Sequence, residues 1–224
     1  MGLRGLAVIA ALSAGALAAG CSNSPPSIAE TFWQLNLVRH PSSGRTNEAL
    51  SFFVDVEADD GIKDLDSIYL LSDGHELFWR LDSNNWVKNE RDGRLWVGSN
   101  QIEMNDRSPL PRGVYRVLVT ALSGERAVET FNLNAVPLDP ATVSFPTLMI
   151  GPTSVAVRSA FATTTVWVYN RLGELIATKS GAPGRWPLAS LLPSSILQAE
   201  ATTLVAYAYD RQRDCGLISG PYSF

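Results

Sequence analysis

The chain is poor in the residues that metal sites and disulfide frameworks need. It holds two cysteines and two histidines, His40 and His75, among 224 residues. Two cysteines exclude a disulfide-rich scaffold, and two histidines leave little material for a histidine-based metal site. Basic residues are also few: 18 Lys and Arg stand against 22 Asp and Glu, without a basic run. We therefore expect no nucleic-acid partner.

The motifs of common catalytic sites are missing as well. The sequence contains no Gly-x-Ser-x-Gly, no HExxH, no CxxC and no glycine-rich phosphate loop. Ser194 and Ser195 follow a proline, without the strand-to-helix setting of a nucleophile elbow. We therefore predict that the protein is not an enzyme and that it uses no cofactor and no metal.

The N-terminal segment has the pattern of a targeting signal. Arg4 gives a positive start, and residues 5–19 (GLAVIAALSAGALAA) carry no charge. A membrane-spanning helix needs about 20 apolar residues, so this stretch is too short to span and fits the h-region of a secretory signal. The segment ends in small residues and a cysteine, Leu17-Ala18-Ala19-Gly20-Cys21.

This segment resembles the precursor of a bacterial lipoprotein. The lipobox of that family is a small-residue triplet before an invariant cysteine, usually with leucine three residues ahead of it. Here Ala18 takes the leucine place and Leu17 lies one residue earlier. The resemblance covers residues 1–21 and implies that Cys21 receives a diacylglycerol thioether and, after cleavage, usually a third acyl chain. The alternative is an ordinary cleaved signal peptide in which Cys21 is incidental.

Acylation would make membrane lipid a partner of Cys21. Each buried CH₂ of a chain such as palmitate contributes about 0.8 kcal/mol, so two or three chains hold a protein on a membrane. We thus predict a signal peptide over 1–20 and a lipidated tether over 21–27. The protein would be anchored in the cell membrane or the outer membrane, its folded part in the periplasm or at the cell surface. In enteric bacteria an Asp directly after the lipidated cysteine resembles an inner-membrane retention signal. This chain has Ser22 at that position, which favours the outer membrane.

The rest of the chain alternates apolar and polar residues with a period of two, which is typical of β-strands. One example is 52–58, and another is 115–121. Turn pairs such as Asp73-Gly74 and Asp92-Gly93 separate the runs at short intervals. We predict strands at 31–39, 49–58, 67–72, 76–82, 94–97, 113–122, 127–135, 142–149, 154–161, 163–169, 174–179, 202–209 and 216–223. Leucines over 187–201 predict at most one or two short helical turns, because Pro193 interrupts them.

Short strands at this spacing predict an all-β fold of two β-sandwich domains. The first would be an Ig-like sandwich of about seven strands over 28–136. Two prolines mark a linker at 137–140, and a second, smaller all-β domain would follow over 141–224. A single large sandwich is the alternative.

Residues 109–133 (PLPRGVYRVLVTALSGERAVETFNL) resemble the closing hairpin of bacterial Ig-like and fibronectin type III-like domains. In those domains a Pro and a Gly precede a strand led by tyrosine, and a Gly turn leads to a final strand. Tyr115 occupies the place of a tyrosine-corner residue. The resemblance implies a fold and is silent on function.

Aromatic residues offer one candidate binding site. Trp86 and Trp96 lie in the loop-rich half of the first domain, among Asn and Gln side chains that suit sugar hydroxyls. Exposed rings can act as stacking platforms, so these two tryptophans are candidate glycan-binding residues. The alternative is that they cover the open edge of the sandwich, because tryptophan buries a large area wherever it sits. Trp79 has the apolar parity of its strand and is expected in the core.

The remaining polar candidates have plain structural alternatives. His75 would need the acidic loop 59–66 beside it to form a catalytic or metal site, and the sequence favours a solvated surface turn instead. His40 is likewise expected at a strand end. Cys215 has no intrachain partner if Cys21 is lipidated, and its Arg neighbours could lower the pKa of its thiol. A redox role or an intermolecular disulfide would follow from such a shift, but the sequence favours an inert, partly shielded thiol.

The sequence therefore favours a membrane-anchored lipoprotein of the cell envelope that acts as a non-enzymatic interaction or scaffold module. A glycan-binding lipoprotein that uses Trp86 and Trp96 is the alternative function. The partner would be an envelope protein or a glycan, and the sequence does not identify it.

Overall fold

The computed structural model describes residues 25–57, 61–91, 93–192, 194 and 199–224. The protein is all-β: 59% of it is strand. The described residues contain one short α-helix, α1 (Leu188–Leu191). The expectation of little helix over 187–201 is confirmed for the described part of that segment.

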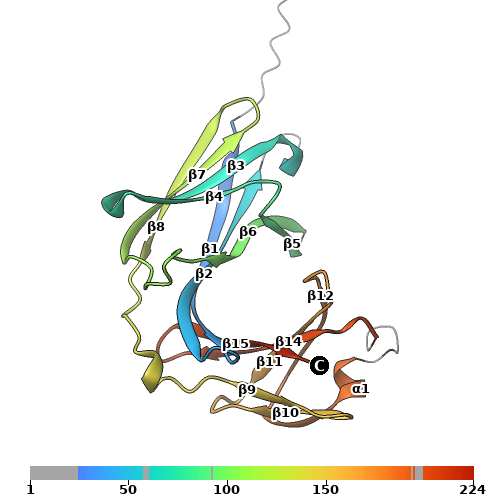
Figure 1. Ribbon diagram of the computed structural model, residues 1–224. Helices are drawn as coiled ribbons and strands as arrows, with labels where there is room; N and C mark the ends of the chain where they lie inside the picture. Colours follow the sequence, from blue (N-terminus) through green and yellow to red (C-terminus); the bar gives the residue numbers. More distant parts are fainter. Residues whose placement is uncertain (1–24, 58–60, 92, 193, 195–198) are drawn as a thin grey trace, which may run out of the picture.

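An eight-stranded sheet runs through the whole molecule and curls into a half-barrel (Figure 1). From one edge to the other its strands are β12 (Leu175–Gly181), β11 (Thr164–Tyr169), β14 (Thr203–Asp210), β15 (Cys215–Ser223), β1 (Ser27–His40), β2 (Arg45–Glu57), β6 (Arg94–Ile102) and β5 (Val87–Arg91).

Two smaller sheets pack against this half-barrel. The four-stranded sheet orders β4 (Leu77–Leu81), β3 (Leu65–Ser72), β7 (Gly113–Ala121) and β8 (Arg126–Leu133). The three-stranded sheet orders β13 (Gly184–Pro187), β10 (Ser154–Arg158) and β9 (Thr147–Ile150). We call the four-stranded sheet with the part of the half-barrel that it covers the upper arm, and the three-stranded sheet with its part the lower arm.

Both small sheets cover the same face of the half-barrel. Successive side chains of a strand point to opposite faces, and residues paired across strands share a face. Leu35 and Leu37 of β1 therefore point the same way, and Leu35 lies in the core of the upper arm while Leu37 lies in a small cluster with Leu217. Figure 1 shows the two small sheets on the outer side of the curl. The outer face of the half-barrel is thus the buried face.

The period-two pattern predicted these cores. Tyr115, Val117 and Val119 of β7 are fully buried in the upper core, opposite Phe52 and Val54 of β2. The core of the lower arm contains the corresponding alternating residues of its strands, Val155, Val157, Val166, Val168, Leu204 and Ala206. The apolar side chains therefore define both the strands and the face that each strand buries.

The strand predictions all overlap observed strands, but two strands, β5 and β13, were not predicted. The polar β5 lies at an edge, and β13 is short. The two sequence blocks also join one sheet, because β1 pairs in parallel with β15 (Asn36 with Gly216) and antiparallel with β2. The boundaries of the predicted domains stay a prediction.

A largely shielded ion pair fastens β2 to the four-stranded sheet. Glu48 of β2 accepts hydrogen bonds from both terminal nitrogens of Arg112, at 2.8 and 2.7 Å, and from the backbone N–H of Leu110 at 2.9 Å. Arg112 also donates to the carbonyl oxygens of Ala135 and Leu110, each at 2.6 Å. One guanidinium thereby ties β2 to the segments before β7 and after β8.

Candidate functional site

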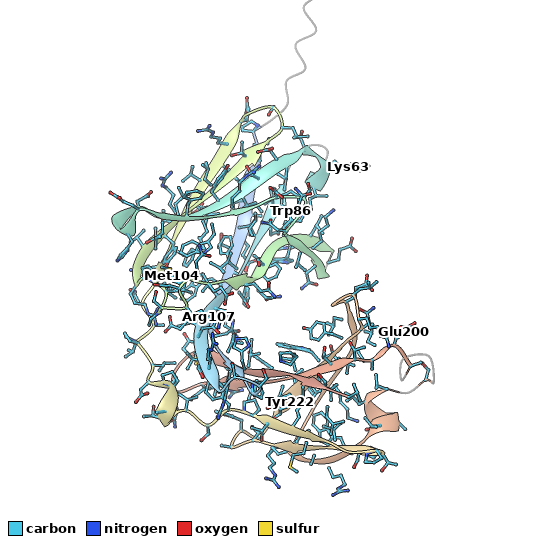
Figure 2. All side chains as sticks on the ribbon, viewed as in Figure 1. Lys63, Trp86, Met104, Arg107, Glu200 and Tyr222 are labelled. Carbon is cyan, nitrogen blue, oxygen red and sulfur yellow. The ribbon has the colours of Figure 1, made fainter. Side chains whose placement is uncertain are left out.

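The inner face of the half-barrel is the surface that the fold leaves uncovered by a sheet. The strand register places on it, from the upper arm to the lower, Trp96, Phe53, Ser51, Phe32, Gln34, Asn36, Gly216, Ile218, Tyr207, Trp167 and Thr165. We call this surface the inner face. In Figure 2 side chains of both arms project toward the inner side of the curl.

A hydrogen-bond network occupies the centre of the inner face. The amide nitrogen of Gln34 donates to Asn36 Oδ1 at 2.9 Å and to the hydroxyl of Tyr207 at 3.0 Å. Asn36 Nδ2 donates to Ser51 Oγ at 3.0 Å and also to the backbone carbonyl oxygens of Gln34 and Ala49. Asn36 is only 1% exposed. Both the oxygen and the nitrogen of its side-chain amide are therefore hydrogen-bonded, and the amide oxygen holds Gln34 in one orientation.

Gly216 leaves the room that this network needs. A Cβ at residue 216 would lie 2.0 Å from Asn36 Oδ1, 2.6 Å from Gln34 Nε2 and 2.9 Å from a ring carbon of Tyr207. Real side chains do not approach so closely, so any other residue would displace the polar groups. Gly216 is required here because it lacks a side chain.

Tyr207 is held on its other side by an aromatic ring. Its ring stacks on Trp167 with centroids 5.1 Å apart and planes 24° apart. Burial raises the pKa of the Tyr207 hydroxyl, although the hydrogen bond from Gln34 acts the other way. The hydroxyl therefore stays protonated at neutral pH, and among the described residues its hydrogen has no acceptor. Tyr207 presents a fixed ring and an unused donor.

Tyr207 also forms part of the wall of a hollow of about 820 Å³ at the end of the lower arm. The hollow is lined by hydroxyl-bearing residues and by the turn between β14 and β15: Thr142, Ser144, Thr163, Thr165, Tyr207, Tyr209, Arg211, Gln212 and Arg213, with Ala160, Phe161, Ala162, Ala208 and Asp210. Arg213 pairs with Asp210 at 2.7 Å, and the Tyr209 hydroxyl donates to Asp214. The lining is thus mixed, with hydroxyl, amide and charged groups beside the rings of Phe161, Tyr207 and Tyr209.

The predicted tryptophan pair does not form one platform. Trp86, labelled in Figure 2, is half-buried against the upper core. Trp96 is also half-buried, but it pairs with Asp55 and Asn89 on the inner face, opposite in parity to the buried Val97. The two indoles therefore lie on opposite faces of the sheet. Trp79 packs against the upper core as expected, and its indole N–H donates to the carbonyl of Glu103 at 2.9 Å.

The histidines are in separate places. His75 lies in the 3-10 turn η2 (Asp73–His75) after β3, and its Nδ1 is 3.1 Å from Ser72 Oγ. The described part of the acidic loop, residues 61–66, precedes or begins β3, and a strand rises about 3.3 Å per residue. The two features are therefore at opposite ends of β3 and do not form a joint site. His40 Nε2 lies 2.9 Å from Asn47 Oδ1 at the end of β1.

The Cys215 thiol is shielded from solvent. The thiol is fully buried with Leu37, Val143 and Leu217, and burial raises its pKa to about 11. The neighbouring carboxylate of Asp210 acts in the same direction, and Arg213 only partly opposes them. Arg213 thus acts in the direction that the sequence suggests for a flanking arginine, but burial and Asp210 outweigh it. The burial fits the inert, shielded thiol that the sequence favours.

Cys21, the predicted lipidation site, lies outside the described residues. The described part of the chain begins at residue 25, and β1 begins at Ser27. Among the helices of the described residues, none has the length and apolar character needed to cross a membrane. In the described ranges no three His, Cys, Asp or Glu side chains gather as metal ligands.

Comparison with known proteins gave little. Neither the family models nor the curated proteins include a match to this chain. Among solved structures, dimeric latent PorU from Porphyromonas gingivalis is similar at 14% sequence identity and a TM-score of 0.33. The similarity covers 89% of this chain and 20% of that chain. The chain thus spans about a fifth of that protein, and a similarity this weak supports no conclusion about function.

Proposed function

We propose that the protein is a lipid-anchored lipoprotein of a bacterial cell envelope and acts as a non-enzymatic binding module. The observation that carries the anchor is the N-terminal pattern: Arg4, an uncharged stretch over 5–19, and small residues before Cys21. The folded part starts at Ser27, so the acyl chains would hold the upper arm close to the bilayer. The lower arm would then point away from the membrane.

The finer fold assignment belongs to this proposal. We interpret the two arms as two β-sandwich domains that share long strands, with the upper one Ig-like. Support comes from Tyr115, whose hydroxyl donates to the carbonyl oxygen of Pro111 at 2.8 Å. This is the contact of a tyrosine corner, in which the hydroxyl reaches back to backbone a few residues upstream.

The inner face is the binding surface that the geometry favours. Its polar groups are ordered by the Gln34–Asn36 network rather than by solvent, and ordered groups lose less freedom when a partner binds. The glycan-binding alternative on Trp86 and Trp96 needs both rings on one surface, and the opposite faces of the two indoles argue against it.

Detergent phase separation tests the anchor. Wild-type protein, expressed with its native N-terminus in a bacterium, should enter the detergent phase, and Cys21→Ala should move to the aqueous phase or stay uncleaved. Cys215→Ala is the matched control, since it removes the other cysteine, which is buried and away from the tether. Equal partitioning of wild type and Cys21→Ala would refute the acyl anchor.

A second variant tests the binding surface. Ile218 lies on the inner face opposite Tyr207, and Ile218→Glu would place a charge there. An envelope component captured by the wild-type protein from solubilised membranes should be lost with Ile218→Glu and kept with Val128→Glu, on an exposed position of the four-stranded sheet. Circular dichroism confirms that both variants fold. Retention by Ile218→Glu would place the binding surface elsewhere.

A further inference from the structure

The hollow beside Tyr207 has the chemistry of a ligand site. Its volume, about 820 Å³, lies within the range of about 300–1,000 Å³ that is usual for ligand pockets. Among the described residues, the side chains of Ser144, Thr163 and Gln212 have no hydrogen-bond partner. Several free donors and acceptors therefore surround one space, next to an aromatic wall.

The charges of the hollow nearly cancel. Arg213 is neutralised by Asp210, and Asp214 next to them binds the Tyr209 hydroxyl. Arg211 is the cation of the lining that has no partner among the described residues. A highly charged anion such as a nucleotide would meet two guanidinium groups and two carboxylates, so no net positive charge would attract it. An apolar ligand would leave the hydroxyl groups without water or partner, which costs free energy.

Tyr207 is fixed before any ligand arrives. Trp167 stacks on one side of its ring, and Gln34 donates to its hydroxyl oxygen, so the hydroxyl hydrogen remains available for an acceptor. An aromatic group held in this way combines apolar contact area with one directed hydrogen bond at a low entropic cost.

We infer that the hollow binds a sugar ring of an oligosaccharide. A sugar ring presents apolar C–H groups on its faces and hydroxyl groups around its edge, which matches one aromatic wall surrounded by hydroxyl, amide and guanidinium groups. Tyr207 contacts the ring, and Thr163 and Gln212 bind its hydroxyl groups. This inference rests on the proposed binding function and assigns its ligand to residues other than Trp86 and Trp96.

Calorimetric titration of the full-length protein in detergent tests the inference. The probes are hexamers of α-1,4-linked glucose, β-1,4-linked N-acetylglucosamine and β-1,4-linked glucose. At least one hexamer should bind, and Tyr207→Ala should weaken that binding about tenfold, the loss expected for an aromatic contact of about 1.4 kcal/mol. Phe78→Ala, which removes an exposed ring from the four-stranded sheet, should leave the affinity for that hexamer unchanged.

A surface double variant guards against misfolding. Thr163 and Gln212 are exposed, so Thr163→Val with Gln212→Ala should keep the fold and weaken binding at least about threefold. Absence of binding by wild type to all three hexamers, or undiminished binding by both variants, would overturn the inference. In either case a protein that still partitions into detergent through Cys21 would leave the proposed anchor standing.

Discussion

Removing the guanidinium at residue 112 should destabilise the protein strongly. Glu48 is 4% exposed at its side chain and Arg112 20%, so the pair is largely shielded from water. In Arg112→Met the Glu48 carboxylate keeps the Leu110 N–H at 2.9 Å as its donor and loses both arginine nitrogens. A buried charge left in this state costs about 3–5 kcal/mol of unfolding free energy.

A double-mutant cycle isolates the interaction. Glu48→Leu combined with Arg112→Met removes both charges at once, and such replacement of a buried pair by apolar residues is often close to neutral. The double variant should therefore be more stable than Arg112→Met alone, with a coupling energy of about 3 kcal/mol. Urea unfolding followed by tryptophan fluorescence measures all four proteins. A loss below about 1 kcal/mol for Arg112→Met, or additive single losses, would show that the pair does not hold β2 against the segments that flank β7 and β8.

Three further perturbations have definite expected outcomes. Gly216→Ala should cost about 1–3 kcal/mol in urea unfolding because its Cβ overlaps the Gln34–Asn36 network, whereas Gly74→Ala, with open space around it, should cost far less. Tyr115→Phe leaves the Pro111 carbonyl without its donor and should lower the unfolding free energy by about 1–2 kcal/mol; an unchanged melting curve would contradict this. Cys215 has a folded-state pKa of about 11 against an ordinary 9.0, so the folded protein keeps its proton where the unfolded chain loses it. Stability should thus fall as the pH rises from 9 to 11, by about 2 kcal/mol more in wild type than in Cys215→Ala.

Local patterns were enough to predict the strands that bury one face. Val117 and Val119 alternate with half-exposed Arg116 and Leu118, and the strand is where the alternation predicts it. The sequence of β5, Val-Lys-Asn-Glu-Arg, has no such alternation, because an edge strand forms by backbone pairing with β6. Polarity at an edge is expected, since it discourages pairing with other chains.

The inner face was not predictable, since its residues come from opposite ends of the chain. Gln34 and Tyr207 are 173 residues apart and meet because β1 pairs with β15 and β15 with β14. Long-range strand order leaves no local signal. Alternation with Val166 and Val168 places Trp167 on the other side of its strand, but its stacking on Tyr207 depends on the register of β11 against β14. The two tryptophans that the sequence suggested, 86 and 96, are close in sequence and yet on different faces.

The central claim is that acyl chains on one sulfur hold this folded body at a membrane. Mass spectrometry of the N-terminal peptide, taken from protein purified out of bacterial membranes, tests it most directly. The predicted result is a peptide that begins at Cys21 and carries the added mass of a diacylglycerol thioether. A mature protein that begins elsewhere, or a Cys21 without acyl mass, would contradict the claim.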